Sequence, residues 1–489
     1  MSGTLVWEAP GKGDWRGLHD HFTRALTPEC RRVLAQGMTE GERVWIAAYG
    51  LPVDTIEPRY VNGRVFISPA PLFGPATNRF PPAWAMWVAA RVVPPFRKRA
   101  KAAARAVVER PWRAEVARWY AEERATFVDA NTALEGVDLT ALDDAGLAAH
   151  LRDARDHLDH GYRTHFRLHG PDLIPVGMLL ARCGDWGIDP VEAAGLLAGY
   201  SPASTGGGDL PAWRLVSGYD LDERCAAELP TIERPAVAAV DTLDPAPWRA
   251  RVPSADREEF DRLLDDARTT YGVRDDNGLL TAAWPAGLLR RAMLEAGRRL
   301  DLDDAELAVE LTVDELCAAL GGAAVSDAAA RRAERLRLSA EPPPAQLGVP
   351  TNFDVHPLPA GMRTIASALF TVRDLGITPP GEREALAGTG IGEDVVVGRA
   401  CVAVDAADAL ARFESGDIVV TAGTCPAWNS ILCAAGGVVT EEGGPLSHAA
   451  VIARELALPA IIGAAEAVAR IPDGAQVELD AKTGRVRVL

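Results

Sequence analysis

The sequence lacks any run of 18 uncharged apolar residues, and its first ten residues lack the basic and apolar segments of a secretory signal. We therefore expect neither secretion nor a membrane-spanning helix. The seven cysteines are scattered and form no CxxC pair, which argues against a zinc site or a redox dithiol. Buried thiols in a reducing cytoplasm are the expected state. A disulfide or thiol nucleophile at Cys425 or Cys433 is the alternative, but neither cysteine stands beside a basic residue.

Positive charge is outnumbered by negative charge. Lys and Arg number 51 against 68 Asp and Glu, a net charge of −17, which predicts that the protein binds neither nucleic acid nor a membrane. Lysine is rare, and no glycine-rich phosphate loop with an attendant lysine is present. We therefore expect no cofactor bound by this chain alone. The basic run 97–105 lies in an alanine-rich segment, which favours a solvated helix face over an anion site.

The length of 489 residues predicts a multidomain protein. We expect a mainly α-helical substrate-binding domain over residues 1–345, because apolar residues recur at helical spacing from about residue 94 to residue 320. Its N-terminal part would contain a short helix at 19–34 and strands at 44–49 and 60–67, the second strand with an Asn-Gly hairpin turn.

The pattern changes in the last third of the chain. Residues 346–387 are rich in proline and predict a linker or hinge without a long helix. Residues 388–489 predict a small α/β domain, because short β-rich runs are separated by glycines. These runs are Val395–Val397, Ile418–Val420, Gly437–Thr440, Ala460–Ile462, Val477–Leu479 and Arg485–Val488.

The motif that carries chemistry in this domain is Thr440-Glu-Glu-Gly-Gly-Pro-Leu-Ser-His448, directly before a predicted helix. Gly443 and Gly444 permit a sharp turn and the close approach of a ligand to backbone amides, and Ser447 is a candidate N-cap. At a helix start, His448 would stay neutral and nucleophilic, and a phosphoryl group on its ring would be stabilised. A histidine that merely caps a helix is the alternative.

This segment resembles the phosphohistidine, or swivelling, domain of the PEP-utilising enzymes, a family that includes PEP synthase, pyruvate phosphate dikinase and rifampicin phosphotransferase. The resemblance runs from residue 392 to residue 489. The motifs that carry it are Gly398-Arg-Ala, Gly416-Asp-Ile-Val-Val, Pro426-Ala-Trp428, the His448 motif, Ala453-Arg-Glu-Leu456 and Leu458-Pro-Ala-Ile-Ile-Gly463.

The resemblance implies that His448 carries a phosphoryl group from one site to another when the domain rotates. It implies a supporting role for Thr440, Ser447 and Arg454. Trp428 would lie in a loop beside the histidine, and a position in the core or at a domain interface is the alternative for its ring.

The resemblance extends upstream, to the helical substrate-binding domain of rifampicin phosphotransferase-like proteins. The segments that carry it are Tyr271-Gly-Val-Arg-Asp-Asp276, Gly287 to Leu300, and Leu316. It implies that Arg274, Asp275, Arg290 and Arg291 grip the substrate or the phosphoryl group, and a helix-surface ion-pair network is the alternative. Asp275 stands where relatives often carry Glu, and its shorter carboxylate would lie differently in the pocket.

Those phosphotransferases also carry an ATP-grasp domain, which we do not find in this sequence. ATP and magnesium would then be supplied through a separate ATP-grasp partner.

A histidine-rich segment offers further candidates in the helical region. His165 and His169 are spaced to share a helix face, so a metal site is conceivable, but no HExxH glutamate accompanies them and we predict no metal. We interpret residues 164–172 as pocket lining, in which a general acid/base role and a structural role are both open for the two histidines.

Three hypotheses follow. In the first, His448 transfers a phosphoryl group to a hydroxyl of a small molecule bound by the helical domain. In the second, the enzyme is an ATP-independent dehydratase or cyclase of secondary-metabolite biosynthesis, and His448 acts as a general acid or base together with His165, His169 or Arg274. In the third, the protein is a non-enzymatic scaffold. The first hypothesis is preferred.

Overall fold

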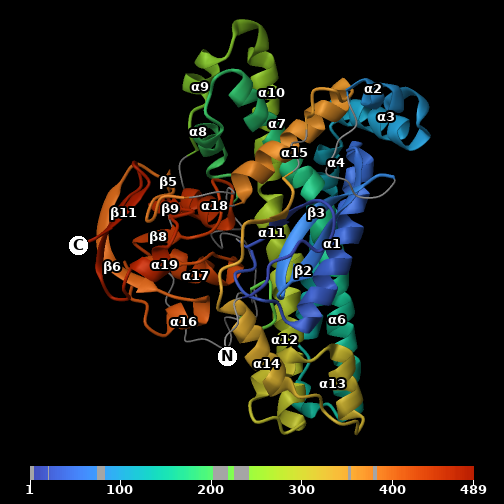
Figure 1. The fold of residues 1–489 in the computed structure, drawn as a ribbon, viewed down its shortest axis with the longest axis vertical. Helices are drawn as coiled ribbons and strands as arrows, with labels where there is room; N and C mark the ends of the chain where they lie inside the picture. Colours follow the sequence, from blue (N-terminus) through green and yellow to red (C-terminus); the bar gives the residue numbers. More distant parts are fainter. Residues whose placement is uncertain are drawn as a thin grey trace.

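The computed structural model describes residues 5–19, 21–73, 83–201, 218–224, 242–350, 354–377 and 383–489. Figure 1 shows a body of long helices with a small sheet, and a C-terminal α/β unit packed against its side. The predicted fold class, a mainly helical region followed by a small α/β domain, is thereby confirmed. In the part of the chain that the structure describes, none of the helices combines the length and the apolar character needed to cross a bilayer.

The N-terminal part joins one helix to an antiparallel sheet. Helix α1 (Pro28–Tyr49) contacts strand β2 (Val53–Val61), and β3 (Arg64–Pro71) returns along β2. The predicted hairpin is confirmed, since Asn62 and Gly63 form its turn with φ values of 50° and 74°. The full sheet order is β2-β3-β1-β4, in which β1 is Asp14–Gly17 and β4 is Gln346–Gly348.

Two predictions for this part are wrong. Residues 44–49 form the last turns of α1 rather than a strand, and the helix begins at Pro28 rather than at residue 19. The buried side chains of Met38, Trp45 and Tyr49 continue one apolar stripe along the helix. A short apolar run fits a buried helix as well as a strand, and here the helical spacing of its neighbours decides between them.

The predicted helical block is confirmed as the core of the molecule. The longest helix, α6 (Asp144–Arg167), contacts both α1 and α12 (Trp284–Arg299), and α7 (His169–Asp185) contacts α10 (Arg257–Tyr271). The other helices of this region are α2 (Ala83–Val92), α3 (Pro94–Glu109), α4 (Pro111–Arg118), α5 (Arg124–Glu135), α8 (Pro190–Ala194), α9 (Ala246–Arg251), α11 (Val273–Gly278), α13 (Val313–Leu320) and α14 (Ala328–Ser339).

The proline-rich segment 346–387 was expected to contain no long helix, and this expectation is wrong. Helix α15 (Ala360–Gly376) lies within it and packs against α7 and α3. The prolines of the segment stand outside this helix, and Met362, Ile365 and Val372 bury one of its faces. Apolar residues at helical spacing therefore outweigh the proline content of the flanks.

The C-terminal domain is built on a seven-stranded sheet of order β11-β10-β6-β7-β8-β9-β5, in which β6, β7, β8 and β9 are parallel neighbours. All six predicted strands are confirmed. The strands are β5 (Thr389–Ile391), β6 (Val395–Val402), β7 (Ile418–Thr421), β8 (Gly437–Thr440), β9 (Ala460–Ile462), β10 (Gln476–Asp480) and β11 (Arg485–Val488). The helices are α16 (Ala406–Leu410), α17 (Asn429–Leu432), α18 (His448–Glu455) and α19 (Ala467–Arg470).

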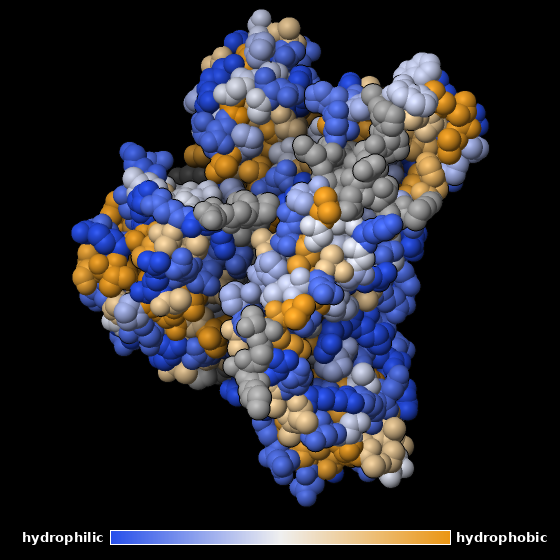
Figure 2. Space-filling view, in the orientation of Figure 1, coloured by the Kyte–Doolittle hydropathy of each residue, from blue (hydrophilic) through white to orange (hydrophobic). Residues whose placement is uncertain are grey.

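The surface is mostly hydrophilic, with an apolar area over α2 and α3 where Val92 and Val108 are exposed (Figure 2). The basic run 97–105 lies on α3, and four of its cations face solvent while Arg99 is buried. A largely solvated face is what the sequence predicted. The six cysteines that the structure describes are free thiols, five of them buried.

Candidate functional site

His448 is the first residue of helix α18, and a glycine turn leads into it. Gly443 has a φ of +103°, and a Cβ on Gly444 would lie 2.5 Å from the carbonyl oxygen of Leu375. Both positions therefore require glycine, as the motif predicted. Ser447 occupies the N-cap position with extended backbone, but its side chain makes no capping hydrogen bond.

The imidazole of His448 is tied to a second loop of the same domain. Its Nδ1 lies 2.8 Å from Oγ1 of Thr424, and no described residue makes a hydrogen bond to Nε2. Burial lowers the pKa of His448 to about 4, opposed by the nearby carboxylate of Asp275 and reinforced by His21 and Arg274. The ring is therefore neutral near pH 7, as the sequence predicted.

His448 is buried although it begins a helix. Only 8% of the surface of His448 is accessible, because the C-terminal domain docks with α18 against the helical region. Two apolar residues of the docked segment, Leu446 and Val451, belong to the hydrophobic core of the helical region. The histidine thus lies at the seam between the two parts of the protein.

Polar contacts between the C-terminal domain and the preceding part of the chain hold this docked arrangement. The backbone N–H of Leu446 donates to the carbonyl of Leu375 in α15 at 2.8 Å. Glu455, in the last turn of α18, accepts hydrogen bonds from the backbone N–H groups of Gly199 at 3.0 Å and Ser201 at 3.3 Å. The thiol of Cys425 donates to the carboxyl group of Glu223 at 3.1 Å.

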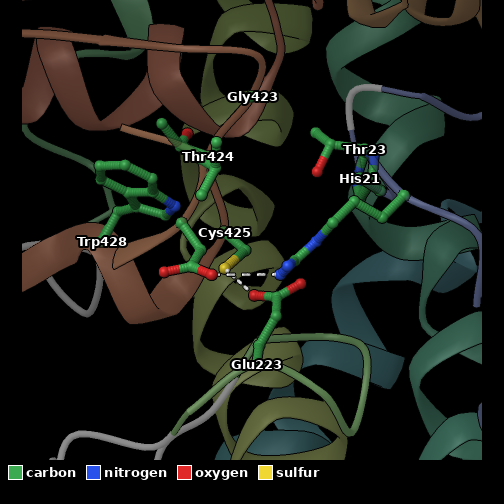
Figure 3. Close-up of a pocket in the computed structure, with 10 residues that line it drawn as sticks. His21, Thr23, Glu223, Gly423, Thr424, Cys425 and Trp428 are labelled. Carbon is green, nitrogen blue, oxygen red and sulfur yellow. Dashed lines mark hydrogen bonds and ion pairs between the residues drawn. The ribbon is translucent and has the colours of Figure 1, made fainter. Parts of the chain in front are cut away.

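A small cleft opens at this seam (Figure 3). Thr424, Cys425 and Trp428 line it from the C-terminal domain, and His21 and Thr23 line it from the N-terminal segment. The volume that a water molecule can occupy is about 10 Å³, which is room for roughly one water. The docked arrangement therefore leaves no space for a larger molecule in this cleft.

The helical side of the seam presents Arg274 and Asp275 from helix α11. The hydroxyl of Ser201 donates to Asp275 at 2.7 Å. Arg274 makes no hydrogen bond or ion pair with any residue that the structure describes, although Asp172 and Asp275 lie near enough to raise its pKa. Arg274 and Asp275 both act on the pKa of His448, so the structure brings the pair near this histidine. The role that the resemblance implies for the pair stays a prediction.

Two of the predicted histidines face each other beside Arg274. Helix α6 ends at Arg167 and α7 begins at His169, and the rings of His165 and His169 lie 5.0 Å apart in edge-to-face contact. The described residues contain no cluster of three or more His, Cys, Asp or Glu side chains suited to hold a metal ion. Each ring is instead bound by a partner of its own.

His165 is held by Asn277, whose amide nitrogen lies 3.1 Å from Nδ1 and 3.3 Å from the backbone carbonyl of His165. His169 is held by Glu42, whose Oε1 lies 2.7 Å from Nδ1, while the indole N–H of Trp45 donates to the other oxygen at 2.8 Å. Burial lowers the pKa of His169 to about 3 and raises that of Glu42 to about 8. The His169–Glu42 pair therefore carries one proton and no net charge.

Asp172, in the first turn of α7, adds a second proton-exchanging group. Its side chain is buried, and burial raises its pKa to about 7, opposed by the positive charge of Arg274. The segment 164–172 was interpreted as pocket lining. The charge of Arg274 lowers the pKa of His165, His169 and Asp172, so all three side chains lie near it.

Other predicted site residues have partners away from the imidazole of His448. Arg290 donates to the carbonyl of Leu221 at 2.8 Å and Arg291 to the carbonyls of Leu134 and Glu135 at 2.8 Å, so both arginines brace the helical region. Arg454 donates to the carbonyl of Pro445 at 2.6 Å and so supports the loop before His448.

Thr440 and Trp428 are likewise buried within the C-terminal domain. The hydroxyl of Thr440 donates to the carbonyl of Glu442 at 2.9 Å, which ties the start of the glycine turn together. Trp428 belongs to the core cluster of the domain and borders the cleft, consistent with the interface aromatic considered from the sequence.

Sequence reasoning did not identify Thr424, Asn277, Glu42 and Glu455 as parts of the site. The first three bind the histidines of the site, and Glu455 binds the backbone of Gly199. All four contacts join segments that are distant in the sequence. The one local signal was the position of Thr424, two residues before the Pro426-Ala-Trp428 motif.

Comparison with known proteins identifies the kind of domain that carries His448. Residues 413–484 match the family described as PEP-utilising enzyme, mobile domain. The C-terminal part of the chain is therefore a mobile domain of the kind found in PEP-utilising enzymes, and His448 lies inside the matched segment. The predicted resemblance is confirmed for this domain.

Particular relatives show how far the likeness extends. Chondramide synthase cmdD of Chondromyces crocatus is 26% identical over 592 aligned residues, which cover 99% of this chain and 14% of that protein. Rifampicin phosphotransferase of Streptomyces sviceus is 43% identical over 105 residues, 22% of this chain and 12% of the relative. Phosphoenolpyruvate synthase of Aeropyrum pernix is 40% identical over 92 residues, 19% of this chain and 11% of the relative.

The chain therefore spans only 11% to 14% of the length of these relatives. The match to rifampicin phosphotransferase has about the length of the C-terminal domain, so the resemblance of the helical region to that enzyme stays a prediction. The match to chondramide synthase is the one of the three that includes the helical region.

Proposed function

We propose that His448 accepts a phosphoryl group and transfers it to a hydroxyl group of a small molecule held among α6, α7 and α11. The observation that carries this proposal is the position of His448. Thr424 binds Nδ1, Nε2 has no hydrogen-bond partner among the described residues, and Arg274 and Asp275 lie close enough to affect its pKa. The mobile-domain match and the likeness to rifampicin phosphotransferase support it.

The first step of this proposal needs a neutral imidazole with its proton on Nδ1, where the N–H would donate to the hydroxyl of Thr424. Nε2 attacks the phosphorus atom of the donor, the N–P bond forms, and the donor's P–O bond breaks. The donor in this proposal is ATP with magnesium, bound by a separate ATP-grasp partner. The small volume of the docked cleft supports a carrier that undocks to reach this donor.

In the second step the hydroxyl oxygen of the acceptor attacks phosphorus, the O–P bond forms and the N–P bond breaks. The neutral imidazole leaves with its Nδ1 proton. The hydroxyl proton passes to a base of the helical region, and the ionised form of Asp172, whose pKa is about 7, can accept it.

A second candidate is an ATP-independent dehydratase or cyclase in which His448 is a general acid or base. The observation that favours it is a set of proton-exchanging groups at the seam. His448, His165 and His169 are neutral near pH 7, and Asp172 has a pKa of about 7. The full-length alignment with chondramide synthase, a biosynthetic protein by its name, is compatible with this role.

Intact mass measurement separates the two candidates. The purified protein is incubated with ATP and magnesium, with and without a lysate of the source organism, beside a His448→Ala control. An acid-labile phosphoryl adduct that depends on His448 supports phosphotransfer. An unmodified protein under all of these conditions contradicts it and favours the dehydratase.

A further inference from the structure

The hydrogen bonds of Asn277 determine which nitrogen of His165 carries its proton. Only the NH₂ end of an amide can face a carbonyl, so the 3.3 Å contact with the carbonyl of His165 fixes the orientation of Asn277. The same NH₂ group lies 3.1 Å from Nδ1 of His165, and Nδ1 must accept this hydrogen bond. A neutral His165 therefore carries its proton on Nε2 and is a hydrogen-bond donor there.

His165 remains neutral because its pKa is lowered well below the ordinary value, first by burial and then by His169, His21 and Arg274. Arg274 stands three residues before Asn277 on helix α11, on the side of the helix whose amide binds His165. Its positive charge also lowers the pKa of both His165 and His448. Arg274 adds charged donors that no described residue uses. The surface around Arg274 thus offers donors to a ligand.

The acceptors that could neutralise these donors are engaged or weak. Asp275 accepts the hydroxyl hydrogen of Ser201 at 2.7 Å. Asp172 is buried and makes no ion pair with Arg274, and burial disfavours its charged form. A group with several acceptor oxygens and a negative charge would complement this set of donors.

We propose that this surface is an oxyanion site formed by Nε2–H of His165 and the guanidinium group of Arg274, and that it binds the carboxylate of a hydroxy acid. Binding there places the rest of the acceptor beside the imidazole of His448. Asn277 is a positioning residue, because it acts through His165. The inference rests on the proposed function, which supplies the hydroxyl group of the acceptor. A phosphoryl group carried by His448 is the other anion that these donors could bind.

The test uses the unphosphorylated full chain labelled with 15N in histidine. Nitrogen chemical shifts report the proton position of His165, and they are followed during titration with 3-hydroxybutyrate, inorganic phosphate and the uncharged 1,3-butanediol. The His165 resonances are assigned by their loss in His165→Gln. We expect a proton on Nε2 in the free protein, and a saturable shift of the Nε2 signal with 3-hydroxybutyrate that butanediol does not produce.

Asn277→Asp keeps the size of the side chain but replaces the donor with an acceptor. It should move the proton of His165 to Nδ1 and weaken 3-hydroxybutyrate binding by roughly tenfold or more. Asn277→Leu, which adds no charge, should weaken binding in the same direction. Asn131→Asp is the matched control, because Asn131 is also buried and binds another histidine, with its Oδ1 2.8 Å from Nε2 of His157.

The titration can fail or succeed independently of the test of phosphotransfer, because it reads nitrogen shifts of unphosphorylated protein and the other test reads a mass adduct. A proton on Nδ1 of His165 in the unchanged protein, or equal responses to 3-hydroxybutyrate and butanediol, overturns the proposal. If phosphate shifts the His165 signal and 3-hydroxybutyrate does not, the site serves the phosphoryl group and the assignment to a carboxylate is wrong.

Discussion

The hydroxyl of Thr424 lies 2.8 Å from Nδ1 of His448, although 24 positions separate the two residues. Thr424 follows strand β7 and His448 follows strand β8 after the glycine turn. Because β7 and β8 are parallel neighbours, the loops that leave their carboxyl ends meet at one edge of the sheet. The topology of the mobile domain therefore sets which nitrogen of His448 is held and which is available.

Replacing Thr424 by valine keeps the side-chain shape and removes the hydrogen bond to Nδ1. We expect the rate of His448 phosphorylation to fall about tenfold, because one hydrogen bond to the ring contributes about 1 kcal/mol and also fixes the tautomer. The measurement is the time course of the mass adduct. Thr132→Val, on the exposed side of α5, is the control. An unchanged rate in Thr424→Val would show that this contact has no role in the chemistry.

His448→Ala should remove phosphoryl transfer entirely and also cost stability. The ring is buried, and its loss leaves the hydroxyl of Thr424 without this partner, so we expect the free energy of unfolding to fall by about 1–3 kcal/mol. Denaturant unfolding measures this change, and far-UV circular dichroism checks that the fold is retained. Residual turnover at the wild-type rate would exclude His448 from both candidate reactions.

Arg274→Gln should leave phosphorylation of His448 by a donor intact and impair transfer to the acceptor. Loss of a buried charge that holds an anion costs about 2 kcal/mol or more, which corresponds to at least roughly a 30-fold slower transfer. Arg298→Gln is the matched control, because Arg298 is an exposed arginine paired with Glu295. Equal transfer rates in the two variants would place Arg274 outside the acceptor site.

Docking of the C-terminal domain should depend on pH through Glu455. Burial raises the pKa of Glu455 from an ordinary value of 4.5 to about 7, against the hydrogen bonds from Gly199 and Ser201. A raised pKa means that the docked arrangement favours the protonated carboxyl of Glu455. The contribution of Glu455 to the stability of docking is therefore fully present at pH 4 and is lost as the pH rises through 7. Glu455→Gln removes the titration.

The thiol of Cys425 reports on docking, because it is buried and donates to Glu223 across the seam. We measure the alkylation rate of Cys425 in the wild type and divide it by the rate in Glu455→Gln. This ratio should rise between pH 5 and pH 8, because docking of the wild type weakens as Glu455 ionises. Division at each pH cancels the intrinsic titration of the thiol. Glu466→Gln, at an exposed position paired with Arg470, should give the wild-type rate. A ratio that stays constant with pH would remove Glu455 from the docking contacts.

The sequence predicted the parts of the site that are contiguous. The glycine turn and His448 lie in nine consecutive residues, and all six predicted strands of the C-terminal domain exist. It did not predict the partners that fix Nδ1 of each ring, because Thr424, Asn277 and Glu42 reach their histidines through tertiary contacts. A periodicity argument contains no information on such contacts.

The wrong local predictions share a physical cause. Residues 44–49 were expected as a strand because they form a short apolar run, and residues 360–376 as part of a helix-free linker because prolines flank them on both sides. Burial of one apolar face against α7 stabilises α15 despite the flanking prolines. Burial of His448 was missed for a related reason, because the docking surface is formed by the whole helical region.

The most direct test of the central claim is the position of the phosphoryl group on the ring. Protein labelled with 15N in histidine is phosphorylated in the lysate assay, and the 15N–31P coupling is measured beside His448→Ala. The account predicts a single phosphoryl group on Nε2 of His448, since Nδ1 is engaged by Thr424. A phosphoryl group on Nδ1 or on another residue, or a protein that is never phosphorylated, would contradict it.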